Sequence, residues 1–152
     1  MTRVPFPKPL RVELLPNGST PRRVFRLLAI FAYVRTNGER IYTPIDCEVD
    51  GASIPWFWWR LIGPPWGVYA EASVIHDHLW MDARKWAQDA REKALGNWQG
   101  VARNKYEHAN RVFDEALRDC GVTNWRRVLM VWCVRRWARQ ELRRLVRGEV
   151  IR

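Results

Sequence analysis

Residues 69–80 constrain the fold more than any other part of the sequence, because they place a histidine and an aspartate in a helix that is otherwise small or apolar on nearly every side. A helix with this pattern is buried in the centre of a domain. A buried polar group without a partner costs roughly 1–3 kcal/mol. His76 and Asp77 are therefore either paired for structure or retained for chemistry. The surrounding small and apolar residues are Ala70, Ala72, Ser73, Val74 and Ile75.

The order of sequence patterns predicts the fold class. With 152 residues, the chain can form one domain that buries about two-thirds of its unfolded surface. Residues 1–49 are rich in β-formers, residues 50–68 form a loop rich in tryptophan and proline, and residues 69–147 have helical patterns. We expect a single α+β domain, in which a small N-terminal antiparallel β-sheet is followed by a helical bundle around a central buried helix.

The β-rich part contains four expected strands. Residues 10–15 alternate in part, and residues 24–34 are apolar and rich in β-formers, although a short helix is the alternative there. Asn37-Gly38 predicts a hairpin turn into a strand over residues 40–43. Residues 45–49 form the last short strand before the Asp50-Gly51 turn.

Prolines and glycines divide the rest of the chain into helices. Ser53 and Pro55 can begin a short helix through Trp56–Ile62. The buried helix over 69–80 is followed by a polar, solvated helix over 83–95 and, after Gly96–Gly100, by a helix over 101–119 that Cys120-Gly121 ends. Thr123 or Asn124 caps the last helix, Trp125–Arg147, in which arginines interleave with Val128, Leu129, Trp132, Leu142 and Leu145.

Charge and composition limit the function classes. The net charge of +10 favours a polyanionic neighbour, which is nucleic acid, anionic lipid or an acidic protein surface. The three cysteines have no CxxC spacing, which argues against a disulfide framework and a thiolate zinc site. We see neither a signal peptide nor an apolar run of membrane-spanning length, so the expected location is the host cytoplasm or a virion.

The first candidate site is built around His76. On a helix, His76 and Trp80 share a face, whereas Asp77 lies about 100° away. One face of the later helix carries Glu107, Asn110 and Asp114. If the two helices are antiparallel neighbours, a carboxamide or carboxylate can orient the imidazole as a base, and Asp77 is left to bind a cation. The alternative is a hydrogen bond of His76 across the core, with Asp77 capping the helix or pairing with an arginine.

Two other cation sites are weaker hypotheses. A zinc site could use His76, His78 and His108, but helical residues two apart point about 200° apart. The Asp50–Ser53 turn could hold a cation, or it could simply close a loop, as such turns usually do.

The second candidate site is a surface for partners. The tryptophan-rich loop contributes Trp56, Trp58, Trp59 and Trp66, and the last helix contributes Arg135, Arg136, Arg139 and Arg143. Tryptophan suits surfaces that are apolar on one edge and wet on the other. The last helix could contact other proteins, lie on an anionic membrane, contact nucleic-acid phosphates or expose a solvated face.

A family resemblance joins these motifs. The order Asp50–Pro55 (DGASIP), Gly63-Pro64-Pro65, His76-Asp77-x-x-Trp80 and Ala109-Asn110-x-x-Phe113 resembles the DUF1353 family of tailed phages and prophages. The paired helices also look like those of phospholipase A2. That resemblance implies His76 as the base, Asp77 as a Ca²⁺ ligand, and Asn110 in place of an aspartate that orients the histidine.

These observations lead to three hypotheses of function. The first is a non-catalytic virion component, of the tail or its tip, that contacts other phage structural proteins through the tryptophan-rich loop and the basic helix. The alternative is a hydrolase of phospholipase type that acts on the cell envelope. A nucleic-acid-proximal protein at the portal or connector is a third hypothesis.

Overall fold

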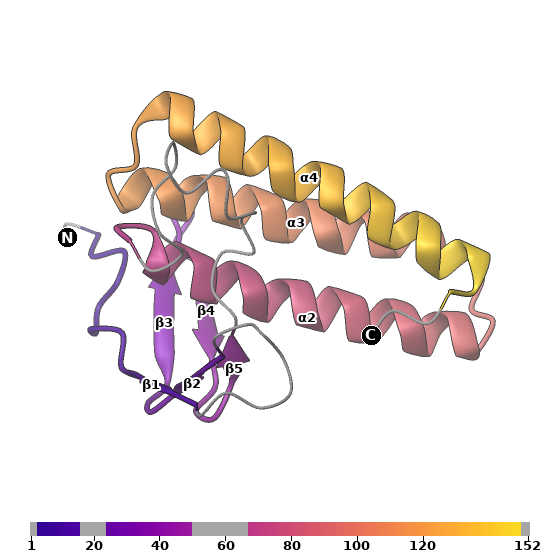
Figure 1. Ribbon diagram of the computed structural model, residues 1–152, viewed down its shortest axis with the longest axis horizontal. Helices are drawn as coiled ribbons and strands as arrows, with labels where there is room; N and C mark the ends of the chain where they lie inside the picture. The colour runs from indigo at the N-terminus through magenta and orange to yellow at the C-terminus, as the bar shows by residue number, and fades with distance from the viewer. Residues whose placement is uncertain (1–2, 16–23, 50–66, 150–152) are drawn as a thin grey trace.

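The computed structural model describes residues 3–15, 24–49 and 67–149. The predictions made for residues 50–66 lie outside these described residues. They comprise the Asp50–Ser53 turn, the Trp56–Ile62 helix and the contacts of Trp56, Trp58, Trp59 and Trp66. The remaining chain has the predicted α+β order, with strands in the first part and helices in the second (Figure 1).

The strands form two small antiparallel sheets rather than one. The first sheet has the order β1-β2-β5 and the second pairs β3 with β4. The strands within the described ranges are β1 (Val12–Leu14), β2 (Phe25–Leu27), β3 (Phe31–Val34), β4 (Arg40–Thr43) and β5 (Glu48–Val49).

The prediction of one strand, or a short helix, over residues 24–34 was wrong, because two strands in different sheets occupy this range. The chain leaves the first sheet after Leu27 and enters the second at Phe31. Between them, the backbone N–H of Leu28 donates to the carbonyl of Arg11 (2.9 Å), and Ile30 is 57% exposed. Apolar content alone did not reveal this break, since both sheets bury side chains from the same run.

The β3–β4 hairpin has the turn that Asn37-Gly38 predicted. Gly38 has φ +85°, a backbone conformation that side chains rarely adopt. The backbone N–H of Arg35 donates to the carbonyl of Glu39 (2.8 Å), and the side chain of Asn37 accepts a hydrogen bond from the N–H of Glu39 (3.0 Å). These contacts set a register in which Tyr33 faces Ile41 across the hairpin.

Three long helices follow, and they lie side by side in Figure 1. They are α2 (Ala70–Glu92), α3 (Trp98–Asp119) and α4 (Asn124–Arg147). The two helices predicted over 69–80 and 83–95 are one continuous helix, because Met81 and Asp82 between them do not break a helix. Helix α3 begins three residues before its predicted start and includes Gly100. As predicted, Gly121 follows the end of α3, and Thr123 is the N-terminal cap residue of α4.

The helices pack around α2 and α3. The strands cover the first half of α2, where Val74 and Ile75 are fully buried beside Phe31 and Leu117. Farther along, the seams between helices are lined by small side chains that let the backbones approach closely. Buried alanines of this part include Ala83, Ala87 and Ala90 on α2, and Ala102 and Ala109 on α3.

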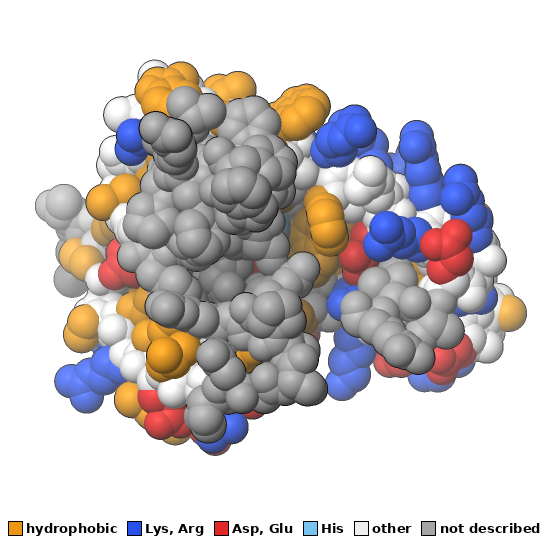
Figure 2. Space-filling model, in the orientation of Figure 1, with side chains coloured by type: hydrophobic (Ala, Val, Ile, Leu, Met, Phe, Trp, Pro, Cys, Tyr) orange, Lys and Arg blue, Asp and Glu red, His pale blue; other side chains and the backbone are white. Residues whose placement is uncertain are grey.

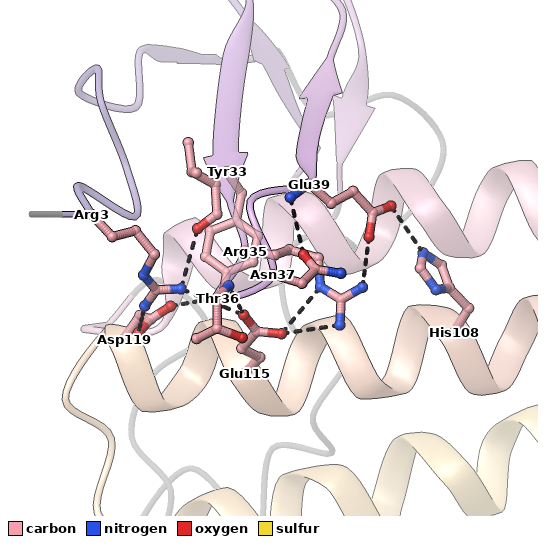
Figure 3. A network of polar contacts seen from close by, with 10 residues as sticks. Arg3, Tyr33, Arg35, Thr36, Asn37, Glu39, His108, Glu115 and Asp119 are labelled. Carbon is pink, nitrogen blue, oxygen red and sulfur yellow. Dashed lines mark hydrogen bonds and ion pairs between the residues drawn. The ribbon is translucent and has the colours of Figure 1, made fainter. Parts of the chain in front are cut away.

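A polar network joins the hairpin and the N-terminal segment to α3 (Figure 3). Glu115 accepts hydrogen bonds from the Arg35 guanidinium (3.1 Å) and from the backbone N–H of Thr36. Asp119 accepts a hydrogen bond from the Tyr33 hydroxyl (2.7 Å) and pairs with Arg3. Burial alone would raise the pKa of Glu115, but the hydrogen bonds from Thr36 and Arg35 outweigh it and lower that pKa.

We predict that Glu115→Gln lowers the free energy of unfolding at neutral pH by about 2 kcal/mol, because the charged acceptor of these hydrogen bonds is lost. The pKa of Glu115 is lower in the folded state, so its stabilisation is present above the unfolded pKa and is lost as the pH falls through the folded pKa. The variant should therefore lose less stability than the original protein between neutral pH and about pH 3.

Urea unfolding followed by circular dichroism at both pH values measures this difference. Glu92→Gln is the matched control, because Glu92 is exposed and has no ion pair with a described residue. Equal acid sensitivity in the two variants would contradict the prediction.

Candidate functional site

His76 lies on the buried side of α2 and is only 7% exposed. Its ring packs between two aromatic side chains, with ring centroids 5.3 Å from Trp80 and 4.5 Å from Phe113. Trp80 is one helical turn away on α2, whereas Phe113 comes from α3. The imidazole is therefore held at the seam between two helices.

Asn110 of α3 provides the polar partner of His76. Its Oδ1 lies 3.2 Å from His76 Nε2, and the Asn110 side chain is fully buried. Because an amide oxygen only accepts, this contact requires the proton on Nε2. The other ring nitrogen, Nδ1, faces Asp77, whose Oδ1 is 3.9 Å away. This is the carboxamide-to-imidazole meeting that the antiparallel arrangement predicted.

The other predicted neighbours of His76 lie elsewhere. Asp114 pairs with Arg127, and Glu107 lies 3.7 Å from Arg135, so both carboxylates of this face connect α3 to α4. The polar partner of His76 on α3 is Asn110 instead. On this face, α3 therefore presents Asn110 to α2, and Glu107 and Asp114 to α4.

The described part of the chain contains no cluster of side chains that would support the metal hypotheses. Among residues 3–15, 24–49 and 67–149, no three side chains of His, Cys, Asp and Glu gather closely enough to hold a metal ion. His108 lies 4.0 Å from Glu39 at the hairpin rather than beside His76. The roles of base, orienting residue and Ca²⁺ ligand for His76, Asn110 and Asp77 stay predictions.

Sequence reasoning missed the continuation of this polar seam toward α4. His76, Trp80 and Arg84 recur every four residues on α2 and therefore share one face. Trp80 packs on Tyr106 of α3, with ring centroids 4.8 Å apart. Arg84 Nε then lies 3.1 Å from Oε1 of Glu141, which is 5% exposed on α4. The spacing of four was the signal that could have identified the seam.

Glu141 is held in an environment that disfavours its charge. Burial raises the pKa of Glu141, and the Arg84 guanidinium opposes that rise. Burial also raises the pKa of the neighbouring Tyr106 hydroxyl. A buried ion pair contributes little net stability but strongly penalises the loss of one partner, so this contact specifies how α2 and α4 are aligned.

A hollow of about 310 Å³ lies between α2 and α3, and neither His76 nor Asp77 lines it. It is lined by Leu79, Asp82, Ala83, Val101, Asn104, Lys105 and His108. The described geometry thus gives His76 a packed position with a satisfied hydrogen bond rather than a place in the wall of this hollow.

The second candidate site, the outer face of α4, is exposed. All four predicted arginines, Arg135, Arg136, Arg139 and Arg143, are exposed. Val128 and Trp132, which the apolar pattern grouped with the buried Leu145, are 62% and 53% exposed. The helix is instead held to the protein by Met130, Val131, Ala138, Glu141 and Leu145.

Six exposed residues at spacings of three and four share one face of α4, and we call them the α4 stripe. Its first half is aromatic and apolar and its second half is cationic, as the colours along this helix show in Figure 2. The guanidinium of Arg136 lies over the Trp132 ring at 5.8 Å from its centroid, where the two halves meet. The stripe consists of Trp125, Val128, Trp132, Arg136, Arg139 and Arg143.

Comparison with known proteins identifies the family. The family model described as "Protein of unknown function (DUF1353)" matches residues 25–134, so the chain belongs to the DUF1353 family. The chain is also 34% identical over 115 residues to the uncharacterized protein y4jT of Sinorhizobium fredii. That match covers 75% of this chain and 29% of the relative, so the chain spans less than a third of the relative's length. No solved structure matches.

None of α2, α3 and α4 has an apolar stretch long enough to cross a bilayer. All three thiols, of Cys47, Cys120 and Cys133, are free.

We predict that Asn110→Ala destabilises the protein by about 2–3 kcal/mol, because it leaves His76 Nε2 buried without an acceptor. Asn104→Ala, at an exposed position of the same helix, is the control and should change stability by less than about 0.5 kcal/mol. Chemical denaturation measures both values.

The double variant His76→Leu/Asn110→Leu should be more stable than the two single leucine variants together imply, since replacing both partners removes the unsatisfied group. Strict additivity would contradict a hydrogen-bonded pair.

We predict that Arg84→Met destabilises the protein by about 3 kcal/mol at neutral pH, because Glu141 keeps a buried charge without this guanidinium. The pKa of Glu141 is raised in the folded state, so protonation removes that charge as the pH falls. The variant should therefore regain stability toward about pH 5, relative to the original protein. Thermal unfolding at both pH values tests this, with the exposed Arg103→Met as control. A deficit that stays constant with pH would refute the assignment.

Proposed function

We propose that this chain is a non-catalytic component of a multiprotein assembly and that it contacts a partner protein through the α4 stripe. The observation that carries the proposal is the exposure of Trp125, Val128 and Trp132 in a continuous row with arginines. A folded protein gains nothing by leaving two tryptophans of one helix face half exposed to water.

The composition of the stripe fits a protein interface. Tryptophan and arginine dominate the residues that contribute most binding free energy at such interfaces. Arg136, Arg139 and Arg143 have no ion pair with a described residue, so their charges are available to carboxylates of a partner. An acidic protein surface with apolar side chains would complement both halves of the stripe.

The position of His76 favours the non-catalytic function. Its ring is enclosed by Trp80 and Phe113, and its Nε2 is used by Asn110. A general base has to reach the proton that it removes, directly or through one water. A buried, stacked imidazole is better explained as part of the seam that aligns α2 with α3.

The setting that we propose is a phage particle, in the tail or at its tip. The support for this setting is the resemblance of the DGASIP and His-Asp-x-x-Trp motifs to a family that occurs mainly in tailed phages and prophages. The α4 stripe would then contact another structural protein of the particle. The net charge of +10 would help the chain to associate with acidic neighbours in such an assembly.

We predict that the chain copurifies with particles induced from the strain that carries its gene, and that Trp125→Ser/Trp132→Ser reduces its abundance there by about tenfold, since two anchor side chains are lost. The measurement is quantitative immunoblotting of gradient-purified particles. Met81→Ser/Val101→Ser is the control pair, because both side chains are exposed on other helices and neither belongs to the stripe. Unchanged unfolding curves would show that both pairs leave the fold intact.

Two results would overturn this proposal. One is absence of the chain from purified particles. The other is calcium-dependent release of fatty acid from phospholipid vesicles that His76→Ala abolishes without unfolding the protein. The second result would favour the hydrolase of phospholipase type, for which the His76–Asn110 contact of 3.2 Å is the supporting observation.

A further inference from the structure

The β3–β4 hairpin has a second surface, on the side that faces away from the core. Along β3 and β4, Phe31, Tyr33, Ile41 and Thr43 point inward and are buried. Their neighbours alternate to the opposite face, where the register pairs Ala32 with Tyr42 and Val34 with Arg40. This outer face is a mixture of apolar side chains with one arginine and one exposed tyrosine.

The N-terminal segment turns this face into a groove. The backbone N–H of Val34 donates to the carbonyl of Pro5 (2.8 Å), and Phe6 stacks on Phe31 with ring centroids 5.8 Å apart. The segment therefore runs beside β3 and forms a wall. Together they enclose a hollow of about 690 Å³ that extends from Arg3 and Lys8 to Tyr42.

Every charged side chain among the described lining residues of the groove is cationic. Four side chains, Arg3, Lys8, Arg35 and Arg40, carry positive charge, and none of the described lining residues has a carboxylate. Figure 3 shows that Arg3 and Arg35 turn to the carboxylates of α3, where they pair with Asp119 and Glu115. Lys8 and Arg40 are exposed and have no ion pair with a described residue.

The floor of the groove is apolar and accessible. Val4 is 58% exposed, Ile30 is 57% exposed and Tyr42 is 53% exposed. A ligand that covered these side chains would be stabilised by roughly 25 cal/mol per Å² of apolar surface removed from water.

We propose that this groove binds an extended segment of a partner protein in which acidic side chains flank apolar ones. The carboxylates pair with Lys8 and Arg40, and the apolar side chains cover Ile30 and Tyr42. The surface is separate from the α4 stripe, so the proposal goes beyond the function proposed above and does not depend on it.

The charge and the floor together select a peptide over nucleic acid. Strands of nucleic acid need a row of cations for successive phosphates and aromatic rings on which several bases stack. Here two of the four cations are already neutralised by α3, and Tyr42 is the single aromatic ring in the described lining. Two available cations over an aliphatic floor match a pair of carboxylates with leucine or valine between them.

The test measures binding of a fluorescein-labelled peptide, Asp-Asp-Leu-Val-Leu-Asp-Asp, to the whole chain by fluorescence anisotropy. We expect Lys8→Glu/Arg40→Glu to weaken binding by about tenfold or more, since two attractive contacts become repulsive. Ile30→Ser/Tyr42→Ser should also weaken peptide binding, because it removes apolar side chains from the floor of the groove. Lys85→Glu/Arg103→Glu is the matched control, because it makes the same change of net charge at exposed positions of α2 and α3 outside the groove.

Each outcome decides the proposal. Groove variants that weaken binding while the control pair leaves it within about threefold support the proposal. The same loss in groove and control variants would show attraction by net charge alone and would overturn it. Displacement of the peptide by labelled oligothymidylate at lower concentration would assign the groove to single-stranded nucleic acid, and no binding of the peptide at millimolar concentration would remove the peptide site.

Discussion

The enclosure of the first half of α2 is the constraint on which the other contacts depend. Strands β4 and β5 and helix α3 all contact this helix, and Val74 and Ile75 have no exposed surface. A helix enclosed in this way cannot leave a polar side chain without a partner. The hydrogen bond between His76 and Asn110 meets that requirement, and it also sets how α2 lies against α3. About two helical turns after His76, Arg84 of the same helix pairs with the buried Glu141 of α4. This contact aligns α4 with α2, because Glu141 also needs a partner.

Two polar arrangements of different kinds hold the rest of the molecule to this core. The polar contacts along the seam of α2 are few and buried, so the loss of either His76–Asn110 or Arg84–Glu141 leaves a polar group without a partner. The network of Glu115 and Asp119 is half buried and joins the hairpin and the N-terminal segment to α3. Because this network uses Arg3 and Arg35 internally, it decides which cations of the hairpin remain available for a ligand. Stability and the proposed peptide groove are therefore linked through the same carboxylates.

Local signals in the sequence predicted the parts of the fold that depend on single residues. The hairpin turn requires a positive φ at position 38, which glycine adopts without strain. Gly121 follows the end of α3 for the same reason. Helical spacing predicted that Asn110, Glu107 or Asp114 could meet His76 if the two helices were antiparallel, and the structure selects Asn110. The break between β2 and β3 did not follow, because both strands are apolar and only their partners differ. The joining of two expected helices into α2 was missed since a change from buried to polar composition looked like a boundary.

The sequence by itself determined the α+β order, the hairpin turn and the long basic helix, because these follow from periodicity and from backbone preferences of individual residues. Only the tertiary structure decided which face of α4 is buried. Apolar periodicity grouped Val128 and Trp132 with Leu145, yet packing against α3 turned Met130, Val131 and Leu145 inward and left the first two exposed. The physical reason is that α4 has apolar residues on several sides, so the shape of the neighbouring surface, rather than hydrophobicity, selects the side that is covered.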